Sequence, residues 1–213
     1  MDCRPNSYQI GLVAVCGALL AVSLIRPNYP QEQWLQHPPT VIAFAALLWA
    51  ARKQWFSNAA MTCLVAFIAL HIVGARWIYS YVPYEHWCDG MVGSGPYEWF
   101  GWTRNHYDRL VHVAFGVLFV LPLVEVAMRF GRLRFGGAIA FALLMIASVS
   151  AVYEVFEWLL AMIAAPEYAE AYNGQQGDLW DAQKDMALGL AGGAVAAGIL
   201  WLNRRIKRDR SPT

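Results

Sequence analysis

Charge is what this sequence has least of. Asp, Glu, Lys and Arg make up only 15% of its 213 residues, and the formal net charge is +1. A soluble domain averages about 25% charged residues, so this chain lacks the charge that a water-exposed surface needs. The near-zero net charge gives no indication of nucleic-acid binding, and we expect no nucleic-acid partner.

Cysteine is scarce as well. The four cysteines (Cys3, Cys16, Cys63 and Cys88) form no CxxC pair and no spacing typical of a metal site. Internal repeats and low-complexity tracts are missing from the sequence. These absences exclude a disulfide scaffold and a disordered chain, and the content of 58% hydrophobic residues favours a membrane protein.

The hydrophobic residues gather in uncharged runs. A transmembrane helix needs about 20 apolar residues, with a range of about 17–25. Five runs are long enough, at residues 5–25, 33–51, 54–75, 135–153 and 186–203, and a shorter sixth run covers 110–124. We predict an all-α polytopic membrane protein with one membrane domain (1–213) and six transmembrane helices, at about residues 8–26, 39–55, 58–81, 108–128, 135–162 and 182–203. Pro38 and Pro39 are expected to open the second helix.

Basic residues predict the orientation, because Lys and Arg concentrate in cytoplasmic loops. They are abundant after the predicted second, fourth and sixth helices and rare in the other loops. The basic residues are Arg52, Lys53, Arg129, Arg132, Arg134, Arg204, Arg205, Lys207, Arg208 and Arg210. We therefore expect a multi-pass protein of the bacterial inner (cytoplasmic) membrane with both termini in the cytoplasm.

Ionisable residues at the outer ends of three predicted helices are the most informative feature. Within each helix they are three or four residues apart, so each group shares one helix face. They are Asp108, His112, Glu154, Glu157, Asp178, Asp181 and Asp185. Because ionisable groups in a membrane usually face a bundle interior or a cavity, all but Asp185 are predicted to converge in one outward-facing pocket. Arg76 and Tyr79 are expected to close this pocket, with His71 deeper.

Carboxylates with an imidazole suit a divalent metal ion, and close carboxylates recruit a cation or share a proton. The hypothesis of a metal site takes as ligands Asp108, His112, Glu157, Asp178 and Asp181. Glu154 or Asp185 would then act as general base. The alternative interpretation gives each residue a separate structural role, in which Asp108, Asp178 and Asp181 favour helix N-termini and Glu154 or Glu157 pairs with Arg76.

Three functions remain open at this level. One is a membrane protein that binds an ion, a lipid or a protein partner, and another is a metal-dependent enzyme acting on a lipid-linked substrate at the outer leaflet. A proton-coupled transporter is the third, but it should have polar groups along the inner half of the membrane. That half looks apolar apart from His71, taken as a hydrogen-bonded interhelical residue, and Glu125, which is expected to pair with Arg129.

Several motifs resemble a known family. They are Leu70-His71 with Tyr79 and Val82-Pro83, then RNHYDRL at 104–110, YEVFEW at 153–158 and QGDLWDAQKDM at 176–186. In order and spacing they resemble the YjdF-like inner-membrane proteins, a bacterial family of unknown function, over residues 40–200. A looser resemblance links the chain to VanZ-like membrane proteins. The resemblance implies the topology and location and marks the seven ionisable positions, but it implies no reaction.

Overall fold

The computed structural model describes residues 6–163 and 175–209. Within these residues the chain is entirely helical apart from turns and connections. The eight helices are α1 (Ser7–Ser23), α2 (Pro30–Lys53), α3 (Asn58–Arg76), α4 (Tyr84–Val92), α5 (Pro96–Phe100), α6 (Tyr107–Arg129), α7 (Phe135–Ile163) and α9 (Asp181–Asp209).

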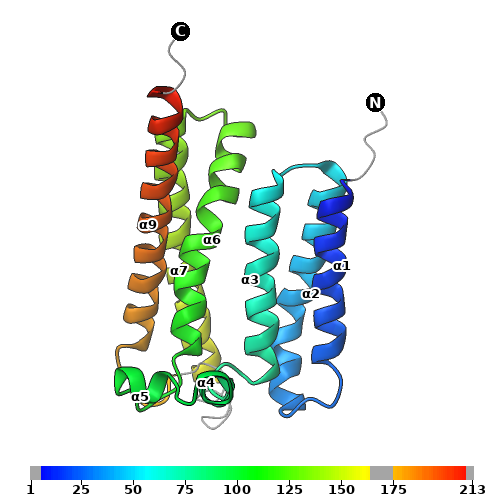
Figure 1. Ribbon diagram of the computed structural model, residues 1–213, viewed down its shortest axis with the longest axis vertical. Helices are drawn as coiled ribbons and strands as arrows, with labels where there is room; N and C mark the ends of the chain where they lie inside the picture. The colour runs from blue at the N-terminus through cyan, green and yellow to red at the C-terminus, as the bar shows by residue number, and fades with distance from the viewer. Residues whose placement is uncertain (1–5, 164–174, 210–213) are drawn as a thin grey trace.

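The six long helices form two groups of three (Figure 1). Helices α1, α2 and α3 pack on one another, as do α6, α7 and α9, and the two groups meet where α3 packs against α6. The short helices α4 and α5 lie across one end, which we call the α4–α5 end, whereas α1 begins and α9 ends at the opposite end. This arrangement is that of an up-and-down bundle with a seam through its middle.

Several helices have the length and composition of membrane spans. Four qualify by both measures, namely α3, α6, Phe135–Leu160 of α7 and Asp181–Lys207 of α9, and α1 is a shorter apolar helix. Large apolar side chains such as Ile42, Leu144 and Val152 are exposed on the outside of the bundle, as expected for a surface that faces lipid. The predicted class, an all-α polytopic membrane protein, agrees with this architecture.

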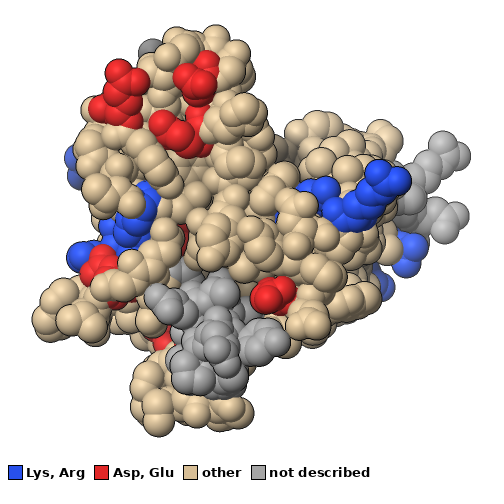
Figure 2. All heavy atoms as spheres, turned by 90° about the horizontal axis from the view of Figure 1, so that it is seen from below, with Lys and Arg blue, Asp and Glu red and all other residues tan. Residues whose placement is uncertain are grey.

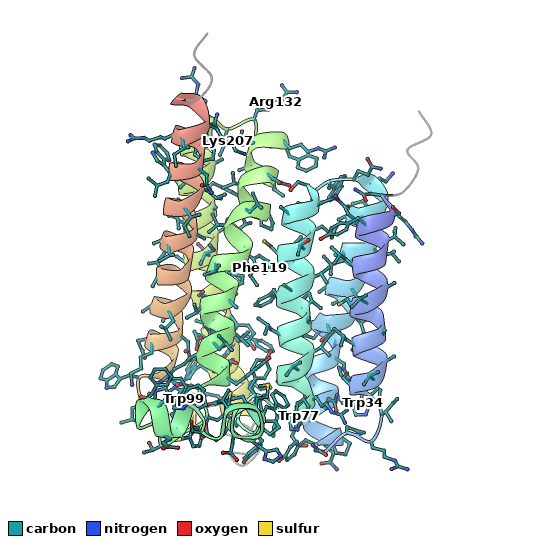
Figure 3. The ribbon with its side chains drawn as sticks, in the orientation of Figure 1. Trp34, Trp77, Trp99, Phe119, Arg132 and Lys207 are labelled. Atoms are coloured by element: carbon teal, nitrogen blue, oxygen red, sulfur yellow. The ribbon has the colours of Figure 1, made fainter. Side chains whose placement is uncertain are left out.

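The two ends of the bundle differ in composition. Arg132 and Lys207 lie at the end opposite α4 and α5, whereas Trp34, Trp77 and Trp99 lie at or near the α4–α5 end (Figure 3). Tryptophan favours the membrane–water interface. Seen from the α4–α5 end, acidic and basic side chains both reach the surface (Figure 2).

Helix α2 begins at Pro30, not at Pro38 or Pro39 as we expected. Pro30 occupies the first turn, where its missing N–H costs nothing, and Pro38 and Pro39 lie inside the helix. Next to these prolines, the Thr40 hydroxyl donates to the Gln36 carbonyl at 2.8 Å and also contacts Nε2 of His71. Internal prolines are tolerated in membrane helices more readily than in soluble ones.

Helix α3 ends at Arg76, five residues before the predicted end. Ile78 and Tyr79 have φ angles of 44° and 55°, a left-handed conformation that is strained for a β-branched residue. The turn folds the Tyr79 ring onto Gly74, where an added Cβ would lie 2.7 Å from the ring. The glycine therefore permits the turn that brings Tyr79 back to His71.

Both ends of the seam between α3 and α6 are tied. At one end Glu125 accepts hydrogen bonds from the amide and hydroxyl of Ser57, at the start of α3. Arg129, the partner we expected for Glu125, instead donates to the Gln54 and Trp55 carbonyls after α2. At the α4–α5 end the Tyr107 hydroxyl donates to the Leu70 carbonyl at 2.9 Å.

Helices α6 and α9 approach almost to backbone contact. A Cβ added to Gly116 would lie 1.9 Å from the carbonyl oxygen of Gly189, and one added to Gly192 would lie 2.5 Å from that of Val113. Small residues allow this kind of approach in membranes. The crossing at Gly116 and Gly189 fixes which side chains of the two helices meet.

We expect Gly116→Ala to destabilise the protein. Overpacking costs about 1–3 kcal/mol and occasionally more, and the obstacle here is a backbone oxygen, so the effect should lie at the upper end. Gly198→Ala on α9 is the control, because a Cβ there meets nothing within 4 Å. Thermal unfolding in detergent should separate the two variants, and equal stability of both would contradict the close crossing.

Candidate functional site

Asp108 and His112 lie in the first turns of α6 and point inward. The start of this helix is held by Asn105, whose side-chain oxygen accepts from the Tyr107 amide and whose Nδ2 donates to the Val82 carbonyl, both at 2.9 Å. Asp108 is 8% exposed and His112 is 7% exposed. The first turns of α6 thus place a carboxylate and an imidazole in the interior of the bundle.

Two other helices bring carboxylates to the same place. Helix α9 contributes Asp185, which is 2% exposed, and α7 contributes Glu154 and Glu157, each 8% exposed. One ligand atom each of Asp108, His112 and Asp185 lies within 4.8 Å of the others. Nε2 of His112 is 3.7 Å from Oδ1 of Asp108 and 3.7 Å from Oε1 of Glu154.

Two buried carboxylate oxygens in this group lack a hydrogen-bond partner. They are Oδ1 of Asp185 and Oε1 of Glu154, counted over the part of the chain that the structure describes. An unsatisfied buried acceptor costs about 1–3 kcal/mol, and more when it is charged. The site therefore has unused capacity to bind a proton, a water molecule or a cation.

A second layer of acidic residues lies nearer the surface and is neutralised by basic side chains. Asp178 pairs with Lys184 at 2.6 Å, with Arg104 at 3.5 Å and with Arg109. Asp181 pairs with Arg104 at 2.9 Å and with Arg109 at 3.4 Å. Within the described residues, Lys and Arg side chains come within 4 Å of these two carboxylates but not of Asp108, Glu154 or Asp185.

Asp178 precedes α9 and also has a local structural role. Its Oδ1 accepts from the Trp180 amide at 3.1 Å, which stabilises the turn before the helix begins at Asp181. The hydrogen bond from Lys184, followed by those from Trp180 and Arg109, lowers the pKa of this carboxyl to about 2. Asp178 is thus a charged partner of basic groups at neutral pH.

Arg76 and Tyr79 were predicted to close the pocket, with His71 deeper, and the structure places these three residues at two locations. The prediction for Arg76 was wrong, because its side chain donates to the Ser23 carbonyl at 2.7 Å and to the Val22 and Ile25 carbonyls at and just after the end of α1. The carbonyl groups at the C-terminal end of α1 form the negative end of the helix dipole and attract the cation. His71 and Tyr79 hydrogen bond to each other and line a cavity that Asp108 and His112 also line.

This cavity has a volume of about 730 Å³ and lies between the two groups of helices. His71 and Tyr79 form part of one wall, and Asp108, His112 and Ser150 form part of another. Most of the remaining lining is apolar or aromatic, including Phe67, Phe115 and Phe119. The buried polar group therefore opens onto a hydrophobic chamber.

Sequence reasoning missed two contributors to this site. Arg104 was counted only as a loop residue, although it pairs with Asp178 and Asp181, and Asn105 was given no role. Their position in the sequence could have indicated a role, because they lie four and three residues before Asp108 in the loop that leads into its helix. The acidic partners of Arg104 are 74 and 77 positions away in sequence and follow only from the fold.

Comparison with known proteins agrees with this architecture. A family described as "Predicted membrane protein (DUF2238)" matches residues 8–206. The chain belongs to this family. It is 33% identical over 161 residues to the inner membrane protein YjdF of Escherichia coli (strain K12), covering 75% of this chain and 73% of that protein. No solved structure matches.

Family membership confirms the resemblance to YjdF-like proteins and the location in the inner membrane as a multi-pass protein. Membership of this family does not indicate a reaction, since the family's description names none. The chemistry of the site must therefore be inferred from the geometry described above.

The lowered pKa of Asp178 predicts a specific pH dependence. A carboxyl with a folded pKa of about 2 and an unfolded pKa of about 3.9 adds stability above the unfolded value and loses it as the pH falls through the folded one. The difference in thermal midpoint between the unmodified protein and Asp178→Asn should stay constant from about pH 7 to about pH 5 and shrink below about pH 4. A difference that already closes near pH 6 would contradict the ion pairs.

Proposed function

We propose that this inner-membrane protein binds a divalent metal ion between Asp108, His112 and Asp185. The observation that carries the proposal is the juxtaposition of three buried ligand atoms within 4.8 Å, one of whose carboxylates keeps an unpartnered oxygen. A cation would satisfy that oxygen and balance the negative charge of the layer.

The donor set fits such an ion. One imidazole with several carboxylates suits Zn, Mn or Fe and, with more oxygen ligands, Mg or Ca. Glu154 is the best candidate for a further ligand or for a base beside the metal, because its Oε1 is 3.7 Å from His112 and unpartnered. Glu157, one helical turn further along α7, is buried near the same group.

The ligand set proposed here differs from the set expected from sequence. Asp185 replaces Asp178, which is engaged by Lys184 and two arginines, and Asp181, which is bound by Arg104. In this proposal Asp178 and Asp181 hold the arginines in place over the metal site. Their role is to anchor the entrance and not to coordinate the ion.

The proposed topology has six spans and both ends in the cytoplasm. Its support is the concentration of basic residues at the end where α1 begins and α9 ends. Helix α2 counts as a span in this proposal although its first turns are polar. The α4–α5 end, and with it the metal site, would face outward.

A second candidate function is a metal-dependent enzyme acting on a lipid-linked substrate at the outer leaflet. The specific observation in its favour is that the apolar cavity reaches Asp108 and His112. A metal there would polarise a phosphoryl or carbonyl oxygen or generate hydroxide, with Glu154 as general base. A proton-coupled transporter has less support, because the core of α6, α7 and α9 beyond the site is built from Val120, Val124, Ala138, Ile146 and similar residues.

The topology predicts the behaviour of reporter fusions. A C-terminal alkaline phosphatase fusion should be inactive and a C-terminal green fluorescent protein fusion fluorescent, because both would lie in the cytoplasm. Alkaline phosphatase inserted between α4 and α5 should be active. An active C-terminal phosphatase fusion would reverse the orientation and place the carboxylate layer at the cytoplasmic surface.

The metal site predicts a stoichiometric divalent metal in protein purified without chelator, measured by elemental analysis. Changing an outer-sphere partner of a metal ligand typically lowers affinity about 10–100-fold, so Asp185→Asn and His112→Ala should each lower it at least about tenfold. Titration of metal-stripped protein with Zn²⁺ and with Mn²⁺ would measure this.

Glu125→Gln is the matched control, because Glu125 is a carboxylate at the opposite end of α6 that binds Ser57. It should retain the metal. A protein that purifies folded but metal-free, and binds neither probe ion, would end the proposal. Equal loss of metal in Glu125→Gln would show that the effect comes from destabilisation.

A further inference from the structure

The cavity beside the candidate site is open toward the lipid. It lies between α2 and α7, which do not pack against each other within the described residues. Ile42 on α2 and Val149 on α7 both line it, yet they are 69% and 43% exposed. Residues that line a cavity and are also exposed mark its mouth, and this mouth is on the apolar side of the bundle.

The cavity extends from the polar layer toward the middle of the bundle. Asp108 and Phe119 both line it and are 11 positions apart on α6, which corresponds to about 16 Å along the helix. Phe119 lies at mid-height between α6 and α3 (Figure 3). Its ring packs against those of Phe67 and Phe115, so the deep part of the cavity is a wall of aromatic rings.

The other end of the cavity carries polar groups on two walls. Asp108 and His112 lie on α6, and His71 and Tyr79 lie on the side of α3. Because the Thr40 hydroxyl donates to the Gln36 carbonyl, Nε2 of His71 donates to Thr40 and Nδ1 accepts from the Tyr79 hydroxyl. The chamber is therefore polar at one end and apolar at the other.

We infer that this cavity holds the hydrocarbon chain of a membrane phospholipid whose phosphate reaches the metal proposed at Asp108, His112 and Asp185. The inference rests on the proposed function, because without a cation the carboxylates would repel a phosphate. With a divalent ion bound, the phosphate oxygen becomes a suitable ligand. The substrate class of the site is then a phosphate-bearing lipid that enters sideways from the bilayer.

Other occupants fit the chamber less well. A transmembrane helix is about 10–12 Å across and about 30 Å long, which far exceeds 730 Å³. A water-soluble ligand would have to cross the ion pairs of Arg104 and Arg109 with Asp178 and Asp181 or pass through the lipid. A volume of 730 Å³ lies within the range of about 300–1,000 Å³ for pockets that bind small ligands.

The test uses the full chain in nanodiscs of phosphatidylethanolamine and phosphatidylglycerol that contain a trace of phosphatidylglycerol with a photoreactive diazirine on its acyl chain. After irradiation, mass spectrometry identifies the labelled residues, and the metal content of the same sample is measured. We expect labelling of inward-facing cavity residues such as Phe67, Phe115 and Phe119, with a yield at least fivefold lower after metal removal by a chelator.

Variants at the mouth provide the matched comparison. Ile42→Trp and Val149→Trp should lower labelling of the cavity at least fivefold by narrowing its opening. Val41→Trp and Val152→Trp should leave it unchanged, because these exposed neighbours do not line the cavity. All four positions face lipid, so the folded state should tolerate each change.

The outcomes separate this inference from the proposed function. Labelling confined to outward-facing residues, in protein that retains its metal, would overturn the lipid inference and leave the metal site standing. Cavity labelling in a protein that never contains metal would refute the proposed function. It would also overturn the inference that a phosphate reaches the site. An equal labelling yield with a diazirine-labelled diacylglycerol, which has no phosphate, would likewise overturn the role of the phosphate.

Discussion

The close crossing of α6 and α9 is the constraint on which the candidate site depends. Gly116 and Gly189 meet almost at backbone distance, and both helices run from the α4–α5 end toward the opposite end. His112 and Asp185 each lie four residues, about one turn, before these glycines, so the same register brings His112 beside Asp185. Side chains larger than glycine at the crossing would separate the helices and with them the ligand atoms.

Depth divides the acidic residues into two kinds. Near the surface, Asp178 and Asp181 are paired with Arg104 before α6, Arg109 in α6 and Lys184 in α9. One turn deeper, Asp185 has no basic neighbour within 4 Å among the described residues, and lipid-embedded carboxylates are costly. Local rules of stability are broken most often at functional sites, so function is expected where Asp185 and Glu154 each keep an unpartnered buried oxygen.

Sequence periodicity predicted the shared faces on α6, α7 and α9, because spacings of three and four residues follow from helix geometry alone. Periodicity did not predict the start of α2 or the end of α3, because spacing alone does not show where a helix begins or ends. Helix α2 begins at Pro30 and continues through Pro38 and Pro39, and the early end of α3 accompanies the packing of Tyr79 on Gly74. The roles of the metal-binding candidates stay predictions, since family membership establishes the membrane location and no chemistry.

The division of the bundle into two groups explains why a cavity adjoins the polar layer. The groups are tied along the seam of α3 and α6, by Glu125 with Ser57 at one end and by Tyr107 with Leu70 at the other. Within the described residues, α2 and α7 flank this seam without packing against each other, so the space between them is held open by contacts outside it. A ligand that fills such a space must satisfy carboxylates and an imidazole at one end and aromatic rings at the other, and only an amphipathic molecule does both.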